Sequence, residues 1–101
     1  MLRIDISVKA QANIDRIAEY TKSTWGWRQA ETYLAKLEEG FMRIAGNPCL
    51  GSRCDSILDG LYRLEIGKYV AFYIPSQAGV LIVRVLHQQM LPVESRFEEP
   101  N

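Results

Sequence analysis

The chain has 101 residues, of which 48% are hydrophobic, and 12 Lys and Arg residues balance 12 Asp and Glu residues. This length suits one domain over residues 1–101 with a substantial core. The zero net charge argues against a broad phosphate-binding surface, because proteins that bind nucleic acid usually carry a strong positive excess. No apolar stretch approaches the roughly 20 residues that span a bilayer, and the N-terminus lacks the apolar core of a signal peptide. We therefore expect a cytoplasmic protein without a membrane partner.

The first strand and helix are predicted near the N-terminus. Leu2, Ile4 and Ile6 alternate with polar residues, which is typical of a strand with one buried face. Ser7 is a suitable helix N-cap, and Gly26 is a suitable stop because glycine adopts the left-handed conformation cheaply. The helix between them is indicated by residues at helical spacing: Ala10, Ile14, Ile17, Ala18, Thr21 and Trp25.

A second helix follows with almost no connection, so the two must form an antiparallel hairpin. It ends at Gly46–Pro48, and its apolar stripe consists of Ala30, Tyr33, Leu34, Leu37, Phe41, Ile44 and Ala45. Gly40 lies inside it and costs about 1 kcal/mol relative to alanine. Either it marks a close approach to another backbone or it is a tolerated weakness.

Three strands are predicted after a loop over residues 48–60. They are residues 61–66, 69–74 and 80–87, and the short turns between them make them antiparallel neighbours. The order predicts an α+β fold of two layers, β-α-α-β-β-β, with the hairpin on one face of the sheet. Simple alternation in the last strand places Arg84 and Leu86 on the same face as Val80 and Ile82. Both faces of that strand are apolar, so we expect the second face to be covered by the tail, residues 88–101, or by a partner.

The two cysteines, Cys49 and Cys54, lie in the predicted loop. Their spacing, without a second pair or a nearby histidine, is poor for zinc. A reducing cytoplasm disfavours a disulfide. The preferred interpretation is two free thiols, and we expect no metal and no cofactor.

Four short motifs resemble the ParE toxins of bacterial toxin–antitoxin modules, within the larger ParE/RelE superfamily. They are "WGWRQA" from Trp25, "NPCLG" from Asn47, "GLYRL" from Gly60 and "VRVLH" from Val83. Each motif is weak alone, but all four occur in the family's order, and the similarity extends from about Ala10 to Met90. The resemblance implies a RelE-like fold and a ParD-like antitoxin, a ribbon-helix-helix protein whose flexible segment wraps the toxin.

The resemblance leaves two activities to decide between, because one fold serves both. ParE members are associated with inhibition of DNA gyrase by protein binding, and RelE members cut messenger RNA on the ribosome. A degenerate toxin that only binds its antitoxin is a third reading. In the first reading, operator DNA is contacted only through the antitoxin, and no small-molecule ligand is expected.

The nuclease reading depends on a cluster of cationic and acid–base side chains. Arg63 matches a family arginine, and His87, the only histidine, lies near a position where some members carry one, with Arg84 close by in sequence. Val70 stands where ribonuclease members tend to have an arginine, and one missing electrostatic partner commonly costs about 10²–10³ in rate. We therefore predict a non-enzymatic toxin in which His87 is an ordinary strand-end residue.

Aromatic residues near the helical turn suggest a binding surface, since aromatics dominate protein anchors. The plainer reading is that Trp25 caps the core and Trp27 is partly exposed. An open sheet edge also offers backbone groups to a partner strand. The predicted antitoxin-binding residues are Tyr20, Trp25, Trp27, Tyr33, Arg63, Arg84 and Leu86.

Overall fold

The computed structural model describes residues 3–88, and these form two helices and one five-stranded sheet. The elements are β1 (Arg3–Ile6), α1 (Val8–Trp25), α2 (Trp27–Gly46), β2 (Ser52–Arg53), β3 (Tyr62–Ile66), β4 (Tyr69–Pro75) and β5 (Gly79–His87). The strand order is β1-β5-β4-β3-β2, with β1 parallel to β5 and the other pairs antiparallel. This confirms the predicted α+β order and adds β2, a two-residue strand inside the segment predicted as loop. The predicted tail lies outside the described residues from position 89 onward.

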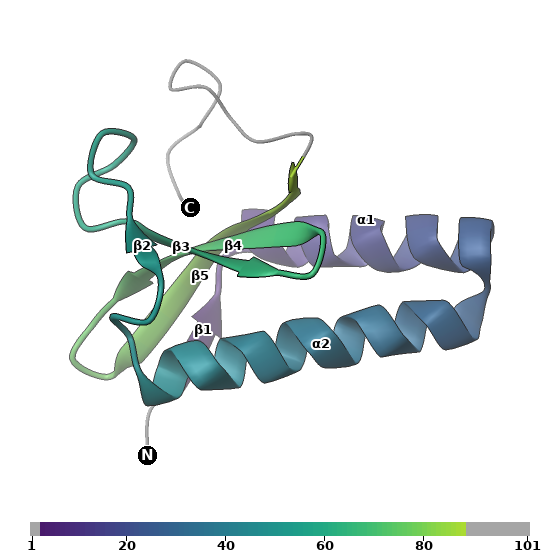
Figure 1. Cartoon of the computed structure of the whole chain (residues 1–101), viewed down its shortest axis with the longest axis horizontal. Helices are drawn as coiled ribbons and strands as arrows, with labels where there is room; N and C mark the ends of the chain where they lie inside the picture. The colour runs from purple at the N-terminus through teal and green to yellow at the C-terminus, as the bar shows by residue number, and fades with distance from the viewer. Residues whose placement is uncertain (1–2, 89–101) are drawn as a thin grey trace.

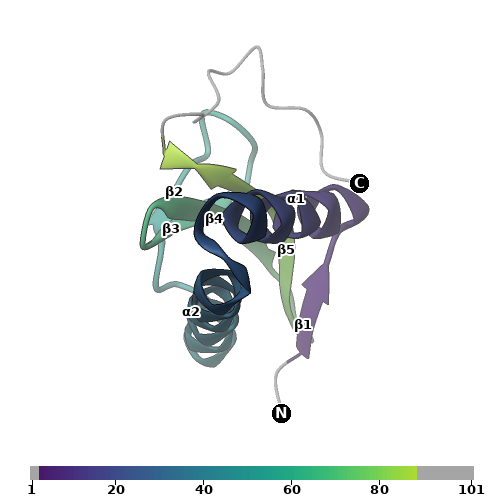
Figure 2. The same ribbon diagram turned by 90° about the vertical axis from the view of Figure 1, so that its right-hand side faces the viewer.

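The helical hairpin begins and ends where the sequence predicts. The Ser7 hydroxyl accepts a hydrogen bond from the Ala10 amide at 3.0 Å and donates one to the Val83 carbonyl at 2.9 Å. It therefore caps α1 and ties it to β5. Gly26 separates the helices at φ 95°, a conformation that a side chain would strain. The joined end of the hairpin extends beyond the strands (Figure 1), and it faces the viewer in Figure 2.

Gly40 marks a close approach between α2 and β3. A Cβ atom there would overlap the Ile66 Cδ1 atom and lie 2.8 Å from Cγ1. The close approach is therefore to a side chain, so neither of the two sequence readings, an approach to another backbone or a tolerated weakness, describes this glycine.

The main core lies between the hairpin and one face of the sheet. Leu37, Phe41 and Ile44 of α2 pack there against β3 to β5. Tyr62, Leu64 and Ile66 of β3 face the helices as predicted, so Arg63 and Glu65 lie on the other face.

A second, smaller core covers the face of the sheet that points away from the helices. Val70, Phe72 and Val83 pack there with residues of the 54–61 segment: Cys54, Ile57, Leu58 and Leu61. The expectation that only the tail or a partner covers this face is therefore wrong. A loop that precedes β3 folds back over it and supplies apolar side chains.

An irregularity in β5 overturns the predicted alternation of its side chains. Phe72 pairs with Arg84 but the next residue, Tyr73, pairs with Ile82, which is a β-bulge. Beyond it Val85 joins the helix-side core and Leu86 the second core. Leu86 therefore does not share a face with Val80 and Ile82, because the extra residue reverses the pattern.

Candidate functional site

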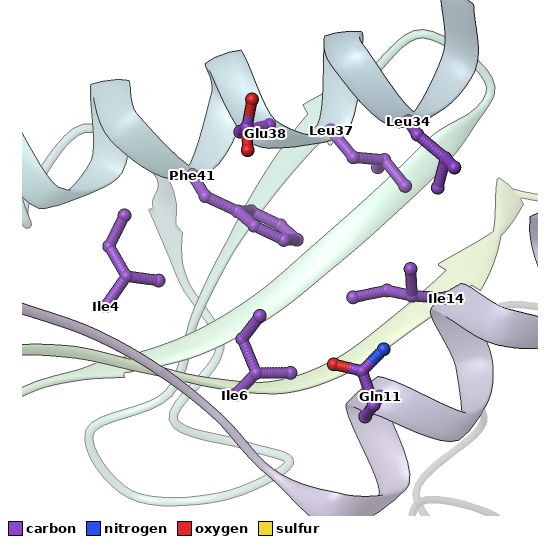
Figure 3. A pocket seen from close by; sticks show the side chains of 8 residues that line it. All are labelled: Ile4, Ile6, Gln11, Ile14, Leu34, Leu37, Glu38 and Phe41. Atoms are coloured by element: carbon purple, nitrogen blue, oxygen red, sulfur yellow. The ribbon is translucent and has the colours of Figure 1, made fainter. Parts of the chain in front are cut away.

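An apolar groove lies between α2, the first half of α1 and β1. Its volume is about 380 Å³, and it is lined by Ile4, Ile6, Gln11, Ile14, Leu34, Leu37, Glu38 and Phe41. Figure 3 shows the β1 isoleucines on one side and the side chains of α2 on the other. The groove is partly open, since Ile6 is exposed. The hairpin therefore leaves apolar surface uncovered where β1 joins the sheet.

The strand beside this groove is an edge of the sheet. β1 stands at one end of the strand order and pairs only with β5 among the described strands. Arg3 and Asp5 alternate with the groove-lining isoleucines, so their exposed ion pair, with the Arg3 Nε atom 3.0 Å from the Asp5 Oδ1 atom, lies on the opposite face of β1. The backbone groups of such an edge are a template for an added strand.

A second hollow, which we call the arginine cleft, lies between α1 and the end of β5. Its volume is about 460 Å³, and it is lined by Asn13, Arg16, Ile17, Tyr20, Tyr69, Arg84, Val85, Leu86 and His87. The Asn13 Oδ1 atom accepts hydrogen bonds from the Arg84 Nε and the Val85 amide, each at 3.1 Å. One side chain of α1 thus fixes both the guanidinium and the backbone of β5 beyond its pairing with β1.

His87 lies within an aromatic row on the helix side of the sheet. It pairs with Tyr69 across the ladder, and the two rings meet edge to face with centroids 5.3 Å apart. Tyr69 meets Tyr33 of α2 in the same way at 5.8 Å, and burial raises the pKa of Tyr69. His87 is therefore part of the packing that joins β4 and β5 to the hairpin.

Arg63 and His87 are not brought together. Arg63 lies on the face away from the helices, with its Nη2 atom 3.7 Å from the Glu65 Oε2 atom, whereas His87 shares the opposite face with Tyr69. Val70 is fully buried in the second core, so the predicted gap in the cation cluster is filled by apolar packing.

Three aromatic residues near the helical turn are largely exposed. Trp25 and Trp27 expose 70% and 59% of their surfaces, and Tyr20 exposes 63%. The plainer reading of Trp25 as a core cap is therefore wrong. Tyr33 is half-buried instead. Of the predicted antitoxin-binding residues, Trp25 and Trp27 lie at the turn of the hairpin, and Tyr20, Arg84 and Leu86 line the arginine cleft. Tyr33 packs against Tyr69, and Arg63 lies on the opposite sheet face. None of the seven lines the apolar groove.

The loop after α2 is held by a buried phenol. The Tyr73 hydroxyl donates to the Pro48 carbonyl and accepts from the Gly51 amide, each at 2.9 Å. Cys49 is an exposed free thiol whose sulfur accepts from the Tyr62 hydroxyl at 3.8 Å, and Cys54 is a buried free thiol in the second core. Over residues 3–88 no group of three or more His, Cys, Asp or Glu side chains could hold a metal ion.

The sequence matches the family model of the ParE toxin of the type II toxin–antitoxin system parDE over residues 4–92. The chain belongs to the ParE toxin family. The match confirms the resemblance carried by the four motifs. It also extends the resemblance toward the N-terminus, so that all of β1 but Arg3 and both hollows lie within the family region.

Individual ParE toxins agree with this assignment. Toxin ParE1 of Mycobacterium tuberculosis (strain CDC 1551 / Oshkosh) is 41% identical over 86 residues, which cover 84% of this chain and 88% of that protein. Toxin ParE1 of Caulobacter vibrioides is 36% identical over 87 residues, with the same coverage. Toxin ParE of Escherichia coli is 30% identical over 87 residues and 84% of each chain.

A solved structure shares the fold of this ParE toxin. A chain of the chromosomal ParDE TA system from P. aeruginosa superposes with a TM-score of 0.73, covering 86% of this chain and 96% of that chain at 18% identity. Separately, no helix among residues 3–88 is both long and apolar enough to cross a membrane.

Proposed function

We propose that this ParE toxin acts in the cytoplasm by binding DNA gyrase and inhibiting it without catalysis, and that a ParD-like antitoxin neutralises it. Membership of the ParE family carries the proposal. The solved relative is named as part of a ParDE system. Operator DNA is reached only through the antitoxin.

The apolar groove is the surface best suited to the antitoxin. Its six apolar side chains come from three elements, and Gln11 and Glu38 are the polar residues that line it among the described residues. Such a groove fits the apolar face of an amphipathic helix. The exposed edge of β1 beside it suits an extended continuation of the same segment. A flexible antitoxin segment thus has room for both modes of contact.

The nuclease alternative has less support. General acid–base cleavage needs its acid, base and cation within hydrogen-bond reach of one substrate. Arg84 and His87 both line the arginine cleft, but Arg63, the third residue of this alternative, lies on the opposite face of the sheet from His87. A third possibility, a degenerate toxin, predicts no growth arrest at all.

Two parallel assays with purified toxin separate these functions. The proposal expects inhibition of gyrase supercoiling and intact messenger RNA in translating ribosomes. Arg63→Ala serves as the matched variant and should inhibit gyrase within about twofold of the parent, a change below 1 kcal/mol. Cleavage of messenger RNA that Arg63→Ala abolishes, without any effect on supercoiling, would establish the nuclease instead.

A charge placed in the apolar groove tests whether the antitoxin binds there. Ile6→Lys puts an ammonium group among apolar side chains, and we expect about 10–100-fold weaker binding of the antitoxin with growth arrest retained. Met42→Lys is the matched control, because Met42 is an exposed apolar residue that does not line the groove. Equal antitoxin affinity for both variants would place the antitoxin elsewhere.

A further inference from the structure

We propose that the arginine cleft is the surface with which the toxin binds its target protein, and that it takes an acidic, partly apolar segment of that target. This inference rests on the proposed function only in that the chain is a toxin that acts by binding a protein. It does not depend on the target being gyrase.

The cleft and the apolar groove lie along different sides of α1. Asn13, Arg16 and Tyr20 follow one another at spacings of three and four residues, so they share one helical side. The groove uses Gln11 and Ile14 instead, and successive residues turn by about 100° around a helix. One helix therefore presents two separate hollows, and two partners can use it independently.

The charge of the cleft calls for an anionic partner. Arg16 and Arg84 both line it, and none of its described lining residues is acidic. Two guanidinium groups beside one hollow repel each other unless an anion lies between them. The planar guanidinium matches a carboxylate with two parallel hydrogen bonds.

One of the two arginines is already positioned. The Nε atom of Arg84 donates to Asn13, and the same oxygen accepts the Val85 amide, so the guanidinium is tied to both α1 and the backbone of β5. A side chain fixed before binding loses less entropy when a partner arrives. Arg16 lies on the exposed surface of α1, where a partner can reach it.

The rest of the cleft matches a protein partner. Ile17, Val85 and Leu86 give it apolar surface, and Tyr20 lies at its border with most of its surface exposed. Arginine and tyrosine around an apolar centre are the composition of protein-binding hot spots. A nucleic acid would demand several phosphate contacts, whereas this cleft offers two arginines on a chain of zero net charge.

The chemistry of the apolar groove is different. Its charged lining residue is Glu38, and no cation lines it among the described residues. A segment that carries carboxylates therefore prefers the cleft, and a segment that is purely apolar prefers the groove. This difference predicts that toxicity and antitoxin binding can be lost separately.

The test compares full-length Arg16→Glu with the charge-matched control Arg43→Glu, an exposed residue in the last turn of α2 that lines neither hollow. Growth arrest after induction without antitoxin is measured first, because it does not presuppose the target. Inhibition of supercoiling and affinity for the antitoxin are measured on the purified proteins. Arg84→Gln is a second cleft variant that removes the charge without reversing it.

We expect growth arrest by Arg16→Glu to require a toxin level at least about tenfold higher than for the parent. The affinity of this variant for the antitoxin should stay within about threefold of the parent's affinity. Retained antitoxin binding shows that the variant is folded. Arg84→Gln should weaken growth arrest in the same direction, and Arg43→Glu should match the parent. If growth arrest depends on Arg16 but the parent toxin does not inhibit supercoiling, the cleft remains the target-binding surface and gyrase is rejected as the target.

Four results would overturn the proposal. Arg16→Glu could arrest growth as strongly as the parent, or Arg43→Glu could lose toxicity equally. Arg16→Glu could also weaken binding of the antitoxin as much as Ile6→Lys does, which would show that the antitoxin occupies the cleft. Binding of RNA or duplex DNA that disappears in Arg16→Glu would likewise replace the protein partner by a nucleic acid.

Discussion

At the scale of single residues, the Tyr73 hydroxyl joins β4 to the loop after α2. Tyr73 is fully buried, and its oxygen is bonded to both the Pro48 carbonyl and the Gly51 amide. Tyr73→Phe leaves these two backbone groups without their partner. We expect a loss of about 1–3 kcal/mol in the free energy of unfolding, measured by urea denaturation.

Tyr62→Phe is the control for this prediction. The Tyr62 ring stacks on Tyr73 with centroids 5.5 Å apart, but its hydroxyl donates to the sulfur of Cys49 on the exposed side and to no buried backbone group that Tyr73 holds. Its removal should cost less than about 0.5 kcal/mol. Equal losses in the two variants would show that the buried bonds do not hold the loop.

The two cysteines should differ in reactivity. Cys49 is exposed, whereas burial raises the pKa of Cys54, and only the thiolate attacks an alkylating reagent. At pH 8 we expect iodoacetamide to modify Cys49 at least about tenfold faster than Cys54, as followed by mass spectrometry. Comparable rates in the folded protein, with Cys49→Ser as the reference for Cys54, would show that Cys54 is not protected.

The raised pKa of Cys54 also sets the direction in which the stability of the fold changes with pH. A thiol with a higher pKa in the folded state contributes stability that is complete below the unfolded value, about 8.5, and is lost as the pH rises through the folded value. Cys54→Ala should therefore flatten the decline in unfolding free energy above pH 8. A decline as steep as that of the parent would attribute it to other groups.

Local chemistry decided which residues could be predicted from sequence. The capping role of Ser7 and the stop at Gly26 depend on atoms within a few positions along the chain. The plainer reading of Trp25 as a core residue was wrong, because helical spacing places it on the buried stripe but the hairpin extends beyond the sheet there.

At the scale of elements, the contact between α2 and β3 depends on the missing side chain of Gly40. Gly40→Ala raises helix propensity by about 1 kcal/mol but drives its Cβ into buried Ile66. We expect a net destabilisation of about 1–3 kcal/mol, because overpacking outweighs propensity. Thermal unfolding measures the change.

Two further variants separate packing from propensity. Gly46→Ala, at the other glycine of α2, places its Cβ in open space, so it should be neutral or stabilising by up to about 1 kcal/mol. Ile66→Val removes the Cδ1 atom that Gly40→Ala would meet, and the double variant should recover part of the loss. No recovery would mean that another contact limits the approach.

The elements themselves were predictable, but their irregularities were not. The periodicity of the apolar residues and the turn-forming residues together predicted the positions of the hairpin and of β3 to β5. The bulge before Arg84 adds one residue without any local sequence signal, and it moved Leu86 to the other face. β2 is only two residues long and exists through its pairing with β3, so its own residues do not predict it.

At the scale of the whole molecule, the pairing of β1 with β5 creates the groove. This parallel contact joins the first strand to the last, and no periodicity within either strand specifies it. The sequence therefore placed Ile14, Leu34 and Phe41 in the core correctly but could not show that they also line an open groove. The arginine cleft was missed for the same reason, since Asn13 and Arg84 are 71 residues apart.

The distribution of burial predicts unequal local stability. Residues 69–73 of β4 are all buried between two cores, whereas all side chains from Lys22 to Gln29, around the hairpin turn, are exposed. In native-state hydrogen exchange we expect amides of β4 to exchange only through global unfolding. Amides near the turn should exchange through local opening that costs several kcal/mol less.

The first half of α1 provides the internal comparison for this experiment. Ser7 and Asn13 bond it to β5 at Val83, Arg84 and Val85, so amides from Ile14 to Ile17 should follow β4. If the turn amides show the same denaturant dependence as β4, the hairpin opens as one unit with the sheet. If they exchange separately, the exposed tryptophans at the turn lie on a segment that can adjust to a partner without disturbing the groove or the cleft.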